Sequence, residues 1–283
     1  MTHILYNAFA DNGNGEKNAR ESLARIEGAV FDDVTALADV QSYMDGLTAE
    51  DTLIVTGGDG TLNRLVNTIE DKEYPFPIFY APAGSGNDFF NDVKDQAEDG
   101  MVRLNRYIRD LPTVTVKGKS YRFLNGVGYG IDGYCCEVGD KMKETDPGKP
   151  INYAGIAIKG LLFHFKPANA KVTVDGITKE YRKVWLAPTM NGRYYGGGMD
   201  IAPEQDRLNA ERKLSVTVLY GSGKIKTLLV FPSIFKGEHI KHTEMVEILE
   251  GKDIKVEFDR PCALQIDGET VLGVTEYEAH AAH

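Results

Sequence analysis

The sequence of 283 residues predicts two domains, an α/β domain built on a parallel sheet followed by a mainly antiparallel β domain. Strand and helix patterns alternate over the first third of the chain, which is typical of a parallel sheet with helices on both faces. From about residue 111, period-two runs and Asp-Gly turn signals replace this alternation. The length also matches about two ordinary domains.

The first domain is expected to alternate strands with helices or loops. Strands are predicted near residues 4–6, 29–31, 53–55 and 78–80, and helices near 16–27, 40–47 and 62–69. Gly28 is a favourable residue just beyond a helix C-terminus. Ligands of such sheets bind beyond the carboxyl ends of the strands, so the loops after residues 55 and 80 should lie on that edge.

The second domain is expected to consist mainly of strands with helical insertions. Strands are predicted near 113–117, 121–124, 171–174, 179–186, 214–220, 246–249, 254–258 and 263–266, and helices near 134–143, 153–165 and 224–235. Asp175-Gly176 is a strong signal for a tight hairpin turn. The boundary between the domains is predicted near 108–112.

The most informative segment is the turn of residues 56–61 (TGGDGT), between a predicted buried strand and a predicted helix. A strand, a glycine turn and a helix N-terminus together let backbone N–H groups hold a phosphate. A carboxylate such as Asp59 repels phosphate unless a metal ion or a proton transfer is involved. It therefore indicates chemistry on phosphate. Taken alone, the turn is also explained by an Asx-type hydrogen bond without a ligand.

A second turn of small residues, 82–89 (PAGSGNDF), also follows a strand and opens a helix. Ser85 and Asn87 offer hydroxyl and amide groups there. Asp88 falls in the first helical turn, where the helix dipole favours a carboxylate, and this charge effect alone would explain it. We expect the two loops to face each other across one phosphate group.

Composition excludes several classes of function. The net charge of −10 argues against a nucleic-acid partner, which requires clustered Lys and Arg. The three cysteines lack zinc spacing and are interpreted as reduced thiols of a cytoplasmic protein. The first ten residues predict a strand rather than a signal peptide, and no apolar run reaches the ~18 residues of a membrane span. The oligomeric state stays open, with a homodimer as one alternative.

GGDGTLN followed by PAGSGNDF resembles the diacylglycerol kinase catalytic-domain family, and is most similar to the soluble bacterial lipid kinases related to sphingosine and ceramide kinases. Further matching motifs follow in the expected order at residues 125–128, 191, 196–199 and 265–269. The resemblance implies a first domain over 1–110 like those of phosphofructokinase and NAD kinase, and a β-sandwich over 111–271. In relatives, the C-terminus returns to the first domain. A tail of about 272–283 could do so here, although this chain ends soon after Tyr277, earlier than those relatives.

The resemblance also implies an activity. It implies a kinase of phospholipid biosynthesis that transfers the γ-phosphate of ATP to the hydroxyl of diacylglycerol or a similar lipid alcohol. ATP and Mg²⁺ would bind on the GGDGT side, and the lipid would be reached by transient contact with a membrane surface, as a peripheral protein. NAD kinase or another small-molecule kinase, and a regulatory module that binds nucleotide without catalysis, are the alternatives.

Roles for individual residues follow from the resemblance. Asp267 would be the general base, with Glu269 nearby, while Asp59 and Asp88 would organise Mg²⁺ and water. The nucleotide would be contacted by Asn7, Thr56, Gly57, Gly58, Asp59, Gly60, Thr61, Asn63, Gly84, Ser85 and Asn87. Because Asp267 follows a predicted strand, we expect it on an accessible turn. Without the resemblance, Asp267-Gly268 would be interpreted as a hairpin turn alone.

The sequence departs from the family pattern at two places. Ala8 follows Asn7 where the family usually has proline, and Glu211-Arg212 replaces the usual Asp-Gly. The second departure puts a structural metal site of the second domain in doubt. Residues 161–165 could line an acyl-chain cleft, although such a stretch is more often ordinary core. The role of Gly196–Gly198 stays open.

Overall fold

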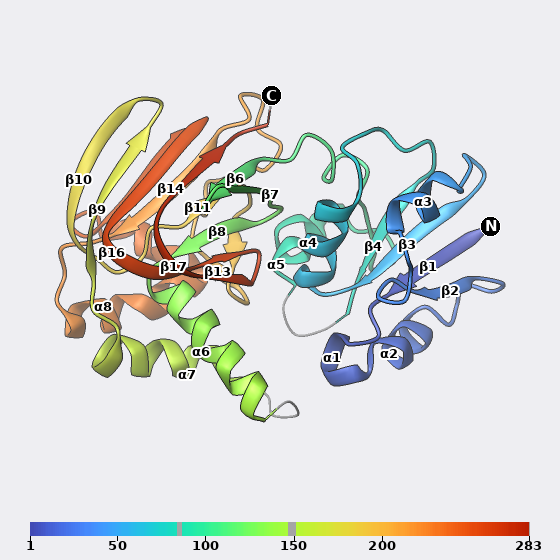
Figure 1. Cartoon of the computed structure of the whole chain (residues 1–283), viewed down its shortest axis with the longest axis horizontal. Helices are drawn as coiled ribbons and strands as arrows, with labels where there is room; N and C mark the ends of the chain where they lie inside the picture. Colours follow the sequence, from blue (N-terminus) through green and yellow to red (C-terminus); the bar gives the residue numbers. More distant parts are fainter. Residues whose placement is uncertain (84–86, 147–150, 283) are drawn as a thin grey trace. The chain divides into compact units, whose positions relative to one another are not determined.

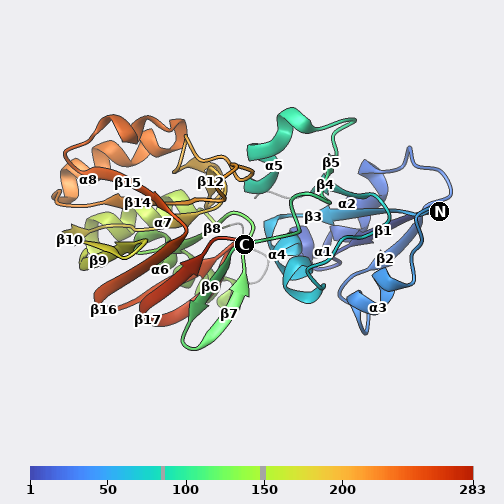
Figure 2. The same cartoon turned by 90° about the horizontal axis from the view of Figure 1, so that it is seen from above.

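The computed structural model describes residues 1–83, 87–146 and 151–282. It divides the chain into two compact units, Met1–Leu111 and Pro112–His283, next to the predicted boundary. Each unit has its own sheet, coloured blue to cyan for the first and green to red for the second (Figures 1 and 2).

The first unit contains one five-stranded sheet in the order β2-β1-β3-β4-β5. Its strands are β1 (Thr2–Tyr6), β2 (Val30–Asp33), β3 (Thr52–Gly57), β4 (Ile78–Pro82) and β5 (Val102–Arg103). The first four are parallel, but β5 is antiparallel to β4, so the sheet is mixed rather than purely parallel. The chain reverses direction before β5 because Asp99 and Gly100 both adopt positive φ.

Helices cover both faces of this sheet. They are α1 (Ala10–Gly13), α2 (Gly15–Ser22), α3 (Val40–Asp45), α4 (Asp59–Thr68), α5 (Asp88–Val93) and the 3-10 turn η1 (Lys94–Gln96). Successive residues Leu53, Ile54 and Val55 of β3 are all buried although they point to opposite faces. The predicted helix over 16–27 is too long, because α2 ends at Ser22 and turns follow it.

The second unit contains a ten-stranded sheet whose pairings are all antiparallel, as predicted. Its strands are β6 (Thr113–Val116), β7 (Lys119–Arg122), β8 (Gly126–Tyr129), β9 (Ala168–Val174), β10 (Ile177–Val184), β11 (Thr189–Met190), β14 (Leu214–Leu219), β15 (Val246–Gly251), β16 (Asp253–Ile266) and β17 (Glu269–His280). The short strands β12 (Tyr194–Tyr195) and β13 (Met199–Asp200) pair separately.

The long hairpin β16–β17 connects two parts of this sheet. β16 is one strand where two were predicted, because a register shift between Glu257 and Cys262 bends it without ending it. Before the bend β16 pairs with β9, and after it with β8, while β17 pairs along both parts. Side chains from both parts pack into one core, in which the Tyr129 and Phe258 rings stack with centroids 3.9 Å apart.

The C-terminal residues lie in the second unit. Residues 269–280 form β17, and its last residues pair with β6 as well as β16. The expectation that a tail from about 272 returns to the first domain is therefore wrong for the described residues. The reason is physical, because Val274, Tyr277 and Ala279 are buried in the core of the second unit.

The helices of the second unit form a second layer with a separate core. They are α6 (Ile131–Thr145), α7 (Tyr153–Lys159), the π-helix η2 (Gly160–His164), α8 (Lys224–Val230) and the 3-10 helices η3 (Phe231–Lys236) and η4 (Glu238–Lys241). Figure 1 shows α6, α7 and α8 on one side of the sheet. Leu161 and Phe165 belong to this core, whereas Phe163 is exposed. In the described part of the chain, no helix is both long and apolar enough to cross a membrane.

Candidate functional site

Three parallel strands of the first unit deliver the predicted nucleotide residues to one edge of the sheet. Asn7 follows β1, the first glycine loop follows β3, and the second loop follows β4. The Asn7 side-chain amide donates to Thr61 Oγ1 at 3.4 Å. A Cβ at Gly15 would lie 1.9 Å from the Asn7 carbonyl oxygen, so only glycine allows α2 to begin this close. Asn7 is thereby fixed beside the start of α4.

The first glycine loop leaves the N-terminus of α4 open. Gly58 precedes the helix, and its carbonyl accepts from the N–H groups of Thr61 and Leu62 at 3.0 and 3.3 Å. A Cβ at Gly57 would lie 2.3 Å from Thr61 Oγ1, so this glycine is required by a close approach. Gly60 is exposed, and apart from its chain neighbours and the backbone of its own helix no described atom lies within 4 Å of where its Cβ would be. First-turn N–H groups without helical partners are suited to hold phosphate oxygens.

The carboxylate of Asp59 joins the two loops. Its Oδ2 accepts from the backbone N–H of Asp88 at 2.7 Å, and its Oδ1 accepts from that of Phe89 at 2.9 Å. These are the first two N–H groups of α5, which have no partner inside the helix. The first residue of α4 therefore caps α5. The structure confirms that the two loops lie together, and it adds that Asp59 makes the connection.

Tyr80 is a second link between the loops, and sequence reasoning missed it. Its buried hydroxyl lies 2.8 Å from the Gly57 carbonyl oxygen and 3.2 Å from Asn87 Oδ1. Burial, with the nearby Asp59 and Asp88 carboxylates, raises the pKa of Tyr80, so the hydroxyl keeps its proton and remains a donor. The sequence signal that could have identified Tyr80 is a hydroxyl-bearing side chain within the apolar strand that leads into the second loop.

The other predicted nucleotide residues differ in their surroundings. Thr56, Thr61, Asn63 and Asp88 are buried. The Thr56 hydroxyl has no hydrogen-bond partner among the described residues, and the Asn63 carbonyl accepts from the Asn67 side chain inside α4. Gly84 and Ser85 lie outside the described residues.

The Ala8 departure has a structural explanation. The Ala8 N–H donates to Asp33 Oδ1 at 3.2 Å, a bond that proline could not make. Burial tends to raise the pKa of Asp33, but hydrogen bonds from Thr35 and Ala8 outweigh it and lower the pKa.

The carboxylates at this edge of the sheet suit Mg²⁺, which keeps phosphate and water ligands, better than they suit a metal ion whose ligands all come from the protein. Among the described residues, no group of three or more His, Cys, Asp or Glu side chains could hold a metal ion. Mg²⁺ usually takes one or two carboxylates and completes its shell with phosphate oxygens and water. The Asp59 carboxylate lies against the backbone N–H of Asp88, so these two residues bring to this edge no more carboxylates than such a site uses.

In the second unit, Asp267 occupies the two-residue turn between β16 and β17. Asp267 and Gly268 both have positive φ, at 46° and 99°, as a tight hairpin turn requires. The expectation of an accessible carboxylate is wrong, because Asp267 is only 8% exposed. Its Oδ2 accepts from the N–H of Leu124 at 2.6 Å, and its Oδ1 from those of Asn125 and Gly126 at 2.8 and 2.9 Å. Hydrogen bonds from three successive backbone N–H groups thus hold the Asp267 carboxylate in the interior of the second unit.

Glu269, by contrast, begins β17 and is exposed. The segment held by Asp267 is also anchored by two side chains that sequence reasoning gave no such role. Asn191 Nδ2 donates to the Leu124 carbonyl at 2.9 Å, and the buried Arg207 donates to the same carbonyl at 3.2 Å. Residues 124–126 are therefore fixed from several directions around the Asp267 carboxylate.

The other departure, Glu211-Arg212, lies at a turn before β14. Glu211 pairs with Lys213, which lowers the pKa of this carboxyl. Arg212 has a φ of +58°, a conformation that the glycine usual at this place in the family adopts without strain. All three glycines of Gly196–Gly198 also have positive φ, which indicates a turn between β12 and β13.

Asp132 is a buried carboxyl that the sequence analysis did not single out. It lies in the first turn of α6, and neither oxygen has a hydrogen bond of good geometry among the described residues. A Cβ at Gly128 would lie 1.6 Å from its Oδ2, so glycine leaves room for it. Desolvation raises the pKa of Asp132 to about 7, although nearby amides, including that of Gln265, partly oppose the shift.

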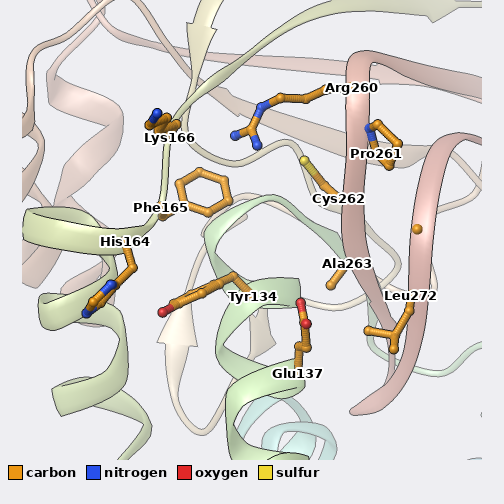
Figure 3. A pocket seen from close by; sticks show the side chains of 11 residues that line it. Tyr134, Glu137, His164, Phe165, Lys166, Arg260, Pro261, Cys262, Ala263 and Leu272 are labelled. Atoms are coloured by element: carbon orange, nitrogen blue, oxygen red, sulfur yellow. The ribbon is translucent and has the colours of Figure 1, made fainter.

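A pocket of about 280 Å³ lies in the second unit, between α6, the segment after η2 and the β16–β17 hairpin (Figure 3). Phe165 and Leu272 give it apolar walls, and its charged lining residues are the basic Lys166 and Arg260 and the acidic Glu137. The Arg260 guanidinium lies 5.6 Å from the centroid of the Phe165 ring. Burial raises the pKa of the Cys262 thiol, which is therefore protonated at neutral pH.

Models of known protein families match both units of this chain. Residues 1–114 match the model of the diacylglycerol kinase catalytic domain, and residues 125–279 match that of the YegS C-terminal NAD kinase beta sandwich-like domain. Similar curated proteins include "Diacylglycerol kinase" of Mycobacterium tuberculosis, 26% identical over 89% of this chain and 84% of the relative. Another is "Putative lipid kinase YtlR" of Bacillus subtilis, 26% identical over 80% of this chain and 75% of the relative.

Solved structures with a similar fold include one described as "Crystal structure of a putative diacylglycerol kinase from Bacillus anthracis str. Sterne". Its TM-score is 0.69 at 18% identity, and the match covers 99% of this chain and 91% of that one. This likeness supports the fold described above for both units.

The Asp267 contacts predict a specific stability effect. Asp267→Asn replaces one accepting oxygen by an NH₂ group that faces a backbone N–H, so we expect a loss of roughly 2–4 kcal/mol in the free energy of unfolding. Asp175→Asn is the matched control, because Asp175 occupies the Asp-Gly turn between β9 and β10 but accepts both N–H bonds, from Lys252 and Asp253, on one oxygen. Urea unfolding should show less than about 1 kcal/mol for the control. Equal losses would contradict this account.

Asp132 predicts a pH dependence of stability. Its pKa is about 7 in the folded state and near 3.8 when unfolded, so the folded chain holds this proton over an interval in which the unfolded chain has released it. Stability from this group is present below about pH 4 and is lost as the pH rises to about 7, by up to about 1.4 kcal/mol per pH unit. Asp132→Asn should remove that slope in unfolding measured from pH 4 to 8, whereas Glu144→Gln on exposed α6 surface should retain it. An unchanged slope in Asp132→Asn would disprove the assignment.

Proposed function

Because the chain belongs to the diacylglycerol kinase catalytic-domain family, we propose that it is a lipid kinase that transfers the γ-phosphate of ATP to the hydroxyl of diacylglycerol or a similar lipid alcohol. The names of the curated relatives support the lipid as acceptor. The main support for the proposal is the cap that Asp59 places on α5. This cap holds two glycine loops of the kind that bind phosphate together at one edge of the sheet.

The first unit is proposed to bind the nucleotide. The open N-terminus of α4, with Gly58 and Gly60, would offer N–H groups to the phosphates. Asn7, fixed against Thr61, would line the same edge. Asp59 and Asp88 would hold Mg²⁺ with water, and the bound ion would neutralise charge on the phosphate oxygens. Nucleotide roles for Thr56, Gly57, Asn63, Gly84, Ser85 and Asn87 remain proposals of the same kind.

The second unit is proposed to serve the acceptor hydroxyl. As the hydroxyl oxygen forms its bond to the γ-phosphorus and the bond to ADP breaks, the Asp267 carboxylate takes the hydroxyl proton. The three amide N–H groups fix this carboxylate in one position, as a general base requires. Glu269 provides an exposed carboxylate two residues away. General base catalysis of this type contributes ~10²–10⁴-fold.

The direct test supplies the protein with γ-labelled ATP, Mg²⁺ and a panel of lipid alcohols in mixed micelles, with NAD as a separate acceptor. We expect label in the organic extract, most strongly with diacylglycerol. Label on NAD alone would replace the proposal with an NAD kinase. Nucleotide binding without transfer to any acceptor would indicate a regulatory module.

Removing the Asp59 cap is predicted to lower turnover far more than its small effect on stability could explain. Asp59→Ala removes the connection between the loops, so we expect at least about a hundredfold lower turnover, because small displacements of reacting groups cost this much. The stability cost of a lost cap is only about 1 kcal/mol.

Asp39→Ala is the matched control for this variant. Asp39 caps α3 by accepting from the Gln41 N–H at 3.0 Å, so its loss should cost similar stability and leave turnover unchanged. Both variants are compared by urea unfolding and by the micelle assay. Equal turnover losses in the two would show that only stability was affected.

A further inference from the structure

Exposed apolar side chains gather on the helical layer of the second unit. Among the described residues, eleven large apolar side chains are exposed, and six of them belong to residues 151–166 and 221–237: Tyr153, Ile158, Phe163, Ile225, Leu229 and Phe235. Phe163, Ile225 and Leu229 are 73%, 74% and 76% exposed. Apolar side chains clustered in this way on a protein surface mark a site that contacts another protein, a ligand or a membrane.

Packing brings these segments together. Helix α8 packs against η2, and the Lys224 ammonium donates to the Leu162 carbonyl at 2.9 Å. Ile225 and Leu229 are four residues apart, so they lie on the same side of α8. The π-helix η2 continues directly from α7. We call Ile158, Phe163, Ile225 and Leu229, on these neighbouring elements, the apolar face.

The two segments that form the apolar face contain basic but no acidic residues. The whole chain has 42 Asp and Glu against 32 Lys and Arg, yet residues 151–166 and 221–237 contain no acidic residue. They contain five lysines: Lys159, Lys166, Lys224, Lys226 and Lys236. Lys166 also lines the pocket that contains Arg260, so these two basic side chains lie near each other (Figure 3). Lys226 pairs with Glu244 at 2.7 Å and Glu137 also lines the pocket, so this surface is not free of acid, but its two segments keep an excess of lysine on an acidic protein. An apolar surface with such an excess is complementary to an anionic layer.

We propose that the apolar face docks on an anionic lipid bilayer, with Phe163, Ile225 and Leu229 inserted among the lipids and the lysines at the phosphate head groups. A second copy of this chain fits the face less well. In a symmetric dimer the same surfaces would meet, so lysines would oppose lysines with no acidic partner in either segment.

The inference rests on the proposed function only in that a lipid substrate requires the protein to reach a membrane. Binding to vesicles does not require phosphate transfer. The two claims can therefore fail separately, and each has its own measurement.

The test is co-sedimentation with vesicles of phosphatidylcholine containing phosphatidylglycerol, and with vesicles of phosphatidylcholine alone. The wild type should bind the anionic vesicles more tightly, and the difference should shrink at high salt. Leu229→Glu should weaken binding at least about tenfold, because it places a carboxylate where an apolar side chain inserts. Ile177→Glu is the matched control, since Ile177 is 70% exposed on β10, outside the helical layer, and it should bind like the wild type.

A second measurement follows transfer of phosphate to a short-chain diacylglycerol dispersed in water. Leu229→Glu should retain this activity, because the apolar face is required only for the bilayer. If no form phosphorylates any lipid alcohol but Leu229→Glu still loses vesicle binding, docking stands and the proposed function fails.

Three results would overturn the docking proposal. The first is that the wild type does not bind anionic vesicles. The second is that Ile177→Glu loses binding as strongly as Leu229→Glu. The third is that light scattering shows a dimer, which Leu229→Glu converts to a monomer without any effect on vesicle binding. The last result would assign the apolar face to contact between copies of the chain.

Discussion

The carboxylate of Asp59 is the constraint on which the rest of the first unit's site depends. It belongs to α4 but caps α5, so the ends of β3 and β4 are tied together through one side chain. Tyr80 adds a second tie beneath it, from its hydroxyl to the Gly57 carbonyl. A phosphate-binding edge needs its N–H donors to be in place before the ligand arrives, because donors that need no reorganisation stabilise developing charge most effectively. The same carboxylate can thus be structural and, as proposed, close to the metal.

Regular periodicity made much of the fold predictable. The alternation of strands and helices located β1 to β4, and the Asp-Gly signal located the β9–β10 turn correctly. Strand β17 was missed because acidic residues and Gly273 interrupt its apolar pattern, and only every second or third residue, such as Val274 and Tyr277, faces the core. β5 was missed because two residues are too short to show a period.

The candidate site was predictable to a different degree. The two glycine loops and their proximity followed from motif and strand order. The side-chain contacts did not, because a sequence does not show which distant N–H groups a carboxylate will meet. Asp267 is the clearest case: its turn was correct, but its carboxylate is buried against residues 124–126, which are remote in the sequence. Asp132 could have been noticed only as an acid within a run of glycines, and its burial depends on the packing of α6 against β16.

The β16–β17 hairpin has a consequence for the order of events during synthesis. All five strands of the first unit's sheet lie within residues 2–103, so that sheet can form while the ribosome is still making the second unit. The second unit begins with β6, whose neighbour in the sheet is β17, more than 150 residues later in the chain. β6 must therefore wait, beside its hairpin partner β7, until the last strand has left the ribosomal tunnel. Nascent chains will pass through a stage with one finished unit and one unit with an unpaired strand edge, which is where chaperones would be expected to bind.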